Sequence, residues 1–148
     1  PRVKMNPPVR EKKHQAALFD AIHEGVIDTV GSDHAPHLLS EKDQPYGQCP
    51  SGVPGMETNL PLLLNAHAQG LLSLEEIANL TCYNIRRMFH YPENDDLVIV
   101  DLNLKKTVDE KELKTKCAWS PFSGRTLQGW PVLTKVNGQV AFNELKGE

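Results

Sequence analysis

The chain has 148 residues, of which 39% are hydrophobic and 24% are charged, a balance typical of a globular domain. Its formal net charge of −3 argues against a nucleic-acid or membrane-surface partner, and no apolar run approaches the roughly 20 residues of a membrane span. Three scattered cysteines form neither a disulfide framework nor a zinc-binding pattern, so we expect a reducing, cytoplasmic setting. The first residue is proline rather than methionine, so we expect an N-terminal part to be absent.

The first 31 residues are predicted to form a strand, a helix and a second strand. Residues 2–5 and 26–31 have the composition of short strands, and residues 11–24 carry apolar side chains at helical spacing that end at Gly25. This order predicts a parallel strand pair joined by a right-handed crossover.

The sequence GSDHAPH at residues 31–37 follows the second predicted strand. It places a carboxylate and two imidazoles at the C-terminal end of that strand, where α/β barrels carry their chemistry. A carboxylate there can bind a divalent metal and accept a proton from metal-bound water, so Asp33 is the first candidate catalytic residue. Catalytic zinc sites usually have about three protein ligands. We do not expect Asp33, His34 and His37 to complete such a site by themselves, and none of the other histidines has a paired spacing.

A long loop and three helices are predicted next. The loop, residues 38–56, ends in two glycines and two prolines that could offer backbone groups to a ligand, although an ordinary turn explains the same residues. A strongly apolar helix is expected over residues 57–69. A second begins at Ser73 with a capping box, and a third spans residues 84–89.

The last third of the chain is predicted to be rich in strands. Residues 97–102 indicate a strand buried on both faces, and residues 105–116 are charged and expected to be exposed. Residues 130–136 and 139–143 flank Asn137-Gly138, which predicts a β-hairpin.

Several motifs, in this order, strongly resemble those of dihydroorotases. They are KMNPPVR (4–10), SDHAPH (32–37), GVPGMET (52–58), LPLLL (60–64), DLVIVD (96–101), SPFSG (120–124) and VNG (136–138). The resemblance implies an α/β fold and covers the C-terminal portion only. Residues 1–90 would be the last βα units of a metal-dependent (β/α)8 TIM barrel. Residues 91–148 would be the strand-rich C-terminal part of a small β-sandwich domain, so the chain is expected to be incomplete as a stand-alone fold.

The resemblance also implies an activity and site residues. Dihydroorotases reversibly hydrolyse dihydroorotate to carbamoyl aspartate in pyrimidine biosynthesis, with one or two zinc ions. Asp33 would be a zinc ligand and the general base, and His37 would bind the substrate carboxylate. Asn6 would contact the ring, and the backbone of Ser51 and Gly52 would meet the substrate's amide edge. No role carries over to His34, which we interpret as a packing or supporting residue.

The remaining residues that the resemblance calls for are not in this sequence. The family's His-x-His pair, carboxylated lysine, two further metal histidines and substrate arginine have no counterpart, so most zinc ligands would lie outside this chain. We therefore expect the fragment to be inactive by itself and to depend on the missing N-terminal portion of the same protein. We also expect a homo-oligomer.

Two alternatives stay open. The protein could be another cyclic amidohydrolase, namely an allantoinase or a hydantoinase, because these share the fold and the aspartate at the strand end. It could also be a non-catalytic dihydroorotase-like subunit that stabilises a partner enzyme. The presence of Asp33, His37 and Asn6 together argues against the second alternative, because a scaffold does not need this set.

Overall fold

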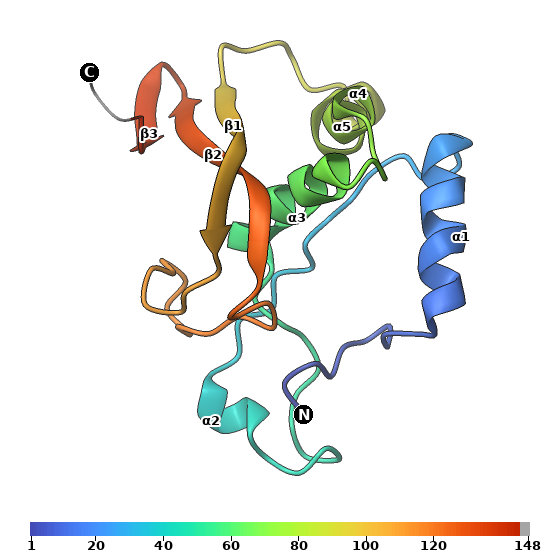
Figure 1. Ribbon diagram of the computed structural model, residues 1–148, viewed down its shortest axis with the longest axis vertical. Helices are drawn as coiled ribbons and strands as arrows, with labels where there is room; N and C mark the ends of the chain where they lie inside the picture. Colours follow the sequence, from blue (N-terminus) through green and yellow to red (C-terminus); the bar gives the residue numbers. More distant parts are fainter. Residues whose placement is uncertain (146–148) are drawn as a thin grey trace.

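The computed structural model describes residues 1–145 and consists of a three-stranded sheet with helices packed on one side (Figure 1). The sheet is antiparallel, with strand order β1-β2-β3. The elements, in chain order, are α1 (Lys12–His23), α2 (Leu39–Lys42), α3 (Met56–Ala68), α4 (Leu74–Ala78), the π-helical turn η1 (Asn79–Tyr83), α5 (Asn84–Phe89), β1 (Leu97–Thr107), β2 (Thr126–Val136) and β3 (Gln139–Asn143).

The main apolar core lies between α3, the neighbouring helices and β1. It is built on three buried side chains from the helical region, Leu64, Leu72 and Ile77. The partly buried residues that pack against them come from α1, α3 and β1 and are Phe19, Ile22, Leu60, Leu63, Ala66, Val100 and Leu102. Helix α3 is therefore covered on more than one side, as its nearly continuous apolar sequence predicts.

Strand β2 crosses α3 at very close range. Gly129 has a φ of +93°, and a Cβ atom there would lie 2.6 Å from Cβ of Leu64. Only glycine allows this backbone conformation and this approach without displacement of the helix. Beside it, the N–H of Gln128 donates to Oδ1 of Asn65 at 3.0 Å. The contact fixes where the sheet rests on α3.

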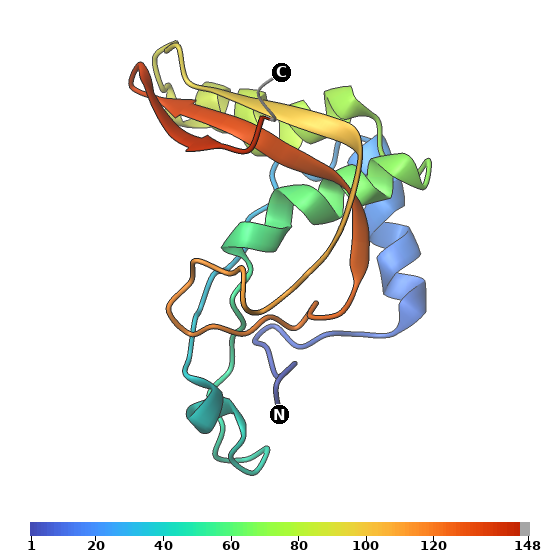
Figure 2. The ribbon, with the colours of Figure 1, turned by 60° about the vertical axis from the view of Figure 1, so that its left-hand side comes forward.

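A second, smaller core lies at the end of the molecule away from the sheet. It contains Val53, Cys117 and Trp119, with Met5 and Leu39 packed against them. Figure 2 shows the N-terminus and α2 at this end. The second core thus joins the start of the chain, the loop before α3 and the segment between β1 and β2.

Most of the helices and the hairpin confirm the sequence predictions. Helices α1, α3 and α5 occupy the expected ranges, and the capping box between Ser73 and Glu76 is formed. Asn137 and Gly138 both have positive φ angles, as the hairpin turn requires. The α/β class is also confirmed, and the division at residue 90 stays a prediction.

Other expectations about strands were wrong. Residues 2–5 and 26–31 form no strand within the described residues, and in place of a parallel strand pair there is one isolated parallel bridge, between His34 and Val53. A strand exists only where a neighbouring backbone supplies ladder hydrogen bonds, and Val30 donates instead to the carbonyl of Leu80. Strand β1 extends to Thr107, and its start, Leu97–Ile99, is exposed rather than buried on both faces.

No helix in residues 1–145 combines the length and the apolar character needed to cross a membrane.

Candidate functional site

Two extended segments, residues 31–37 and 51–56, lie side by side and carry most of the predicted site residues. His34 and Val53 form the parallel bridge, and the N–H of Ala35 donates to the carbonyl of Val53 at 3.0 Å. The N–H groups of Gly55 and Met56 both donate to Nδ1 of His34 at 3.1 Å. Nδ1 therefore carries no proton, and the ring proton of a neutral His34 lies on Nε2.

His34 thus has a definite structural role. Gly55 and Met56 are the N-cap and first residue of α3, whose first N–H groups lack partners inside the helix. The imidazole supplies an acceptor to two of them. The interpretation of His34 as a supporting residue agrees with this geometry, and the side chain anchors the segment that carries Asp33 to the start of α3.

His37, Ser51 and Gly52 are brought together. Nε2 of His37 lies 3.1 Å from the carbonyl oxygen of Ser51. Gly52 is buried, with a φ of +118°, and a Cβ atom there would lie 2.5 Å from Cβ of Ala35. The loop therefore reaches His37 only because residue 52 has no side chain.

Asp33 lies at the exposed end of this arrangement. Its φ of +43° is in the left-handed region, which non-glycine residues seldom adopt and which costs about 1–3 kcal/mol. Such strained residues cluster at functional sites, where the surrounding structure holds them. Here Ser32, whose carbonyl oxygen lies against Gly55, precedes Asp33 and the anchored His34 follows it, so the backbone is held on both sides of Asp33.

Asn6 is exposed, and the chain just before it, at Lys4, is hydrogen-bonded to the candidate site. The N–H of Gly52 donates to the carbonyl of Lys4 at 2.9 Å, so the segment before Asn6 runs beside the Ser51-Gly52 backbone. Within residues 1–145, no hydrogen bond joins the Asn6 side chain to the other predicted residues.

The described residues do not form a complete metal centre. Within residues 1–145 no group of three His, Cys, Asp or Glu side chains is close enough to hold a metal ion. A catalytic zinc site usually needs about three protein ligands. Asp33 could contribute one ligand, so a metal would require donors from elsewhere.

Two residues that the sequence reasoning missed support the site. Trp119 is almost completely buried, and its Nε1 donates to the carbonyl of His37 at 2.8 Å. Lys42 is 0% exposed and donates three hydrogen bonds to backbone carbonyls around Gly52. Lys42 has no sequence signal, because a lysine in a polar stretch is expected at the surface. Trp119 belongs to a residue type that is usually buried, but the sequence does not show which backbone group it contacts.

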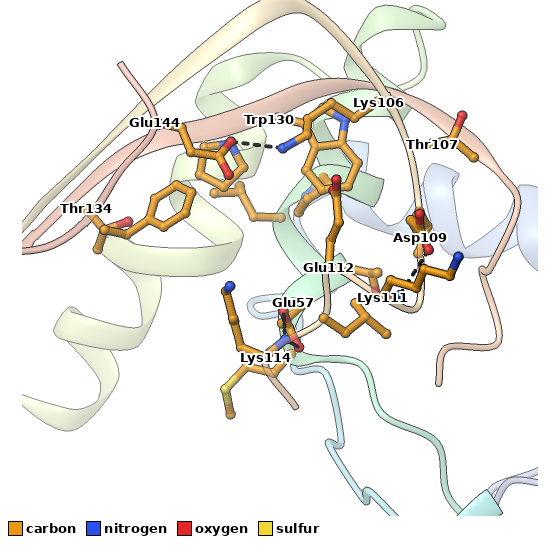
Figure 3. Close-up of a pocket in the computed structure, with 18 residues that line it drawn as sticks. Glu57, Lys106, Thr107, Asp109, Lys111, Glu112, Lys114, Trp130, Thr134 and Glu144 are labelled. Atoms are coloured by element: carbon orange, nitrogen blue, oxygen red, sulfur yellow. Dashed lines mark hydrogen bonds and ion pairs between the residues drawn. The ribbon is translucent and has the colours of Figure 1, made fainter. Parts of the chain in front are cut away.

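A pocket of about 700 Å³ lies elsewhere, between α3, the sheet and the loop after β1 (Figure 3). Its lining includes Trp130, the Lys106–Glu144 ion pair and Glu57, but none of the five predicted site residues.

The Glu57 carboxylate accepts hydrogen bonds from the N–H groups of Lys114 and Thr115. Burial alone would raise the pKa of Glu57, but these bonds outweigh burial and lower that pKa. This glutamate therefore holds a loop, and the pocket borders the candidate site only at Met56.

Comparison with curated proteins finds relatives that are named dihydroorotases. No family model matches the chain. The chain is 38% identical to a dihydroorotase of Halobacterium salinarum over 95% of its own length and 35% of that protein. It is 36% identical to a dihydroorotase of Staphylococcus epidermidis over 97% of its length and 36% of that protein. The chain thus spans about a third of the length of these curated relatives.

Solved structures with a similar fold include hydantoinases. The L-hydantoinase (dihydropyrimidinase) of Arthrobacter aurescens is 34% identical, with a TM-score of 0.92 over 97% of this chain and 35% of that one. The D-hydantoinase of a Thermus species is 28% identical, with a TM-score of 0.89. The resemblance to dihydroorotases that the motifs carry is thereby confirmed for this portion of the chain, together with a likeness in fold to hydantoinases.

Proposed function

We propose that this chain is the C-terminal portion of a dihydroorotase and that the complete protein hydrolyses dihydroorotate reversibly to carbamoyl aspartate. The observation that carries the proposal is the pairing of residues 31–37 with residues 51–56. This pairing collects His37, Ser51 and Gly52 beside the segment of Asp33, as a site for a cyclic amide with a carboxylate substituent would require.

In this proposal the barrel part is residues 1–90, and residues 91–148 belong to the small β domain. The remaining two thirds of the protein would cover the open faces of this chain and supply the other ligands of a zinc site to which Asp33 contributes. Bound zinc polarises a carbonyl and activates water.

The roles of the chain's own residues follow from their chemistry. Asp33 takes a proton from the attacking water and returns it to the departing ring nitrogen, because opening an amide needs a base and then an acid. His37 binds the substrate carboxylate. Nε2 of His37 faces the Ser51 carbonyl at 3.1 Å, so Nδ1, which lies 4.0 Å from the Glu41 carboxylate, is the nitrogen left for the substrate. To donate to a carboxylate from Nδ1 while Nε2 donates to Ser51, the ring must be an imidazolium, which has an N–H on both nitrogens.

The backbone groups at Ser51 and Gly52 would recognise the amide edge. The N–H of Gly52 already donates to Lys4, and the carbonyl of Gly52 accepts from Lys42. A carbonyl oxygen has two lone pairs, so the carbonyls of Ser51 and Gly52 can each accept one more hydrogen bond, from the N–H of a cyclic amide. Asn6 would contact the ring from the neighbouring segment.

A second candidate function is the hydrolysis of hydantoins or dihydropyrimidines. It is favoured by the likeness to the L-hydantoinase, which has a TM-score of 0.92 at 34% identity. Hydantoin itself lacks the substrate carboxylate, so His37 distinguishes the two candidates. In a hydantoinase the substitution His37→Ala would have little effect on the Michaelis constant for an uncharged ring.

The test is hydrolysis by the complete gene product, supplied with zinc, of dihydroorotate, allantoin and hydantoin in parallel. We expect turnover of dihydroorotate alone, with loss of at least about 100-fold in Asp33→Asn, since general acid–base groups contribute about 10²–10⁴-fold. The exposed Asp28, five residues earlier, provides the matched control Asp28→Asn, which should retain full activity.

Other outcomes would point elsewhere. Turnover of hydantoin in preference to dihydroorotate would replace the proposal by the second candidate. A folded, zinc-supplied protein that hydrolyses none of the three and retains no zinc would favour the non-catalytic subunit.

A further inference from the structure

The side chain of Lys42 is the best-satisfied buried charge in the described part of the chain. Its Nζ donates to the carbonyls of Pro50 and Gly52 at 2.8 Å each and to the carbonyl of Lys4 at 3.2 Å. An ammonium group has three N–H donors, so all three are used. The residue is 0% exposed, although lysine is among the residue types least often buried.

The three acceptors surround one peptide segment. Pro50 and Gly52 flank Ser51, so the ammonium holds the backbone on both sides of that residue. The Lys4 carbonyl links the ammonium to the same segment, because it also accepts a hydrogen bond from the N–H of Gly52 at 2.9 Å. A single side chain therefore sets the orientation of the Ser51 carbonyl, which faces Nε2 of His37 at 3.1 Å.

We propose that Lys42 is a positioning residue for substrate binding, which fixes the backbone of residues 50–52 and, through the Ser51 carbonyl, the imidazole of His37. This inference rests on the proposed function, because it assigns His37 and the Ser51-Gly52 backbone to the substrate. Lys42 itself makes no contact with the reacting atoms.

A purely space-filling role does not account for a charged group at this position. Burial of an ammonium group carries a desolvation cost, which lowers the pKa of Lys42 here, and an apolar side chain of similar length would avoid that cost. What an apolar side chain cannot do is satisfy three carbonyls that converge on one point. The neighbouring Lys4 makes similar contacts, since its Nζ donates to the carbonyls of Tyr46 and Cys49.

For Lys42→Met we expect weaker substrate binding with little change in the chemical step. Loss of the three hydrogen bonds in Lys42→Met frees the Ser51 backbone and His37, while Asp33 is held independently through His34 and α3. We expect the KM for dihydroorotate to rise at least about tenfold in the complete protein, with kcat changed less than about threefold. The exposed Lys13 gives the matched control Lys13→Met, for which neither constant should change.

A second readout does not depend on activity. The amide proton of Gly52 should exchange with solvent at least about tenfold faster in Lys42→Met, because its acceptor, the Lys4 carbonyl, loses its fixed position. If Lys42→Met does not fold, Lys42→Gln, whose amide retains two donors, should show smaller changes of the same kind.

The outcomes separate this inference from the proposed function. A rise in KM with nearly constant kcat and faster Gly52 exchange supports it. Unchanged KM and exchange in a folded variant overturn it, as does a fall in kcat at constant KM. If the wild-type protein hydrolyses none of the cyclic amides, the proposed function fails, and the exchange of Gly52 alone decides whether Lys42 orders this backbone.

Discussion

The indole of Trp119 donates from Nε1 to the backbone carbonyl of His37 at 2.8 Å, although the two residues are 82 positions apart. Trp119 lies between β1 and β2, and His37 lies in the loop before α2. The bond ties the strand-rich part of the chain to the candidate site, so a change in the later part should affect substrate binding.

This connection can be tested with Trp119→Phe. The substitution retains an aromatic ring but leaves the His37 carbonyl without its donor, and an unsatisfied buried acceptor costs about 1–3 kcal/mol. We expect the free energy of unfolding of the complete protein to fall by about that amount in urea titrations. Trp130→Phe is the matched control, because it removes a local bond to Leu127 from a half-buried ring. An equal effect of both substitutions would contradict a special role for Trp119.

The close contact between Gly52 and Ala35 predicts that Gly52→Ala is strongly unfavourable. The new Cβ would lie 2.5 Å from Cβ of Ala35, and the φ of +118° would be strained for alanine. We expect a loss of about 2–4 kcal/mol in the free energy of unfolding. Gly47→Ala in the same loop is the control, since nothing lies within 4 Å of its Cβ, and it should change stability by less than about 0.5 kcal/mol. Adding Ala35→Gly should restore part, not all, of the loss.

Glu57 should stabilise the protein in a pH-dependent way. The hydrogen bonds from Lys114 and Thr115 lower its pKa from 4.5, so its contribution is complete above pH 4.5 and is lost as the pH falls through the lowered value. We expect Glu57→Gln to reduce the unfolding midpoint in urea at pH 7 and to have a progressively smaller effect below pH 4.5. The exposed Glu112 gives the control Glu112→Gln, whose effect should be small at all pH values. A constant difference across this range would contradict the assignment.

The capping box at the start of α4 predicts a second acid-sensitive contribution. Hydrogen bonds from Ser73, and then from His23, lower the pKa of Glu76 from 4.5 to about 2. The stabilisation is therefore complete above pH 4.5 and disappears between pH 4.5 and about 2. Ser73→Ala should destabilise the protein by about 1 kcal/mol in thermal or urea unfolding at pH 7. The neighbouring Glu75 provides the control Glu75→Gln, which should have a smaller effect than Glu76→Gln.

Metal content tests where the ligands of the proposed zinc site lie. Since no three candidate ligands converge within residues 1–145, the isolated 148-residue chain should bind no stoichiometric zinc at neutral pH. The complete gene product should retain zinc after dialysis, and Asp33→Ala should lower the amount retained. Elemental analysis of the three samples provides the measurement, and one equivalent of zinc on the isolated chain would refute this prediction.

The sequence by itself determined the local elements and the resemblance. Apolar side chains at helical spacing predicted α1 and α3, Ser73 and Glu76 predicted the start of α4, and Asn137-Gly138 predicted the hairpin. These succeed because caps and tight turns depend on residues close together in the chain. The motif around Asp33 likewise indicated the resemblance to dihydroorotases, since the order and spacing of motifs need no tertiary structure.

Only the tertiary structure decided which segments meet. Residues 26–31 have the composition of a strand, but a strand requires a partner backbone, and that partner is chosen by long-range packing. The buried amine of Lys42, the bond from Trp119 to His37 and the acceptor role of His34 arise from segments far apart in sequence. Lysine and histidine carry no signal of burial, and tryptophan indicates burial without indicating its partner, because the partners are set by the rest of the chain.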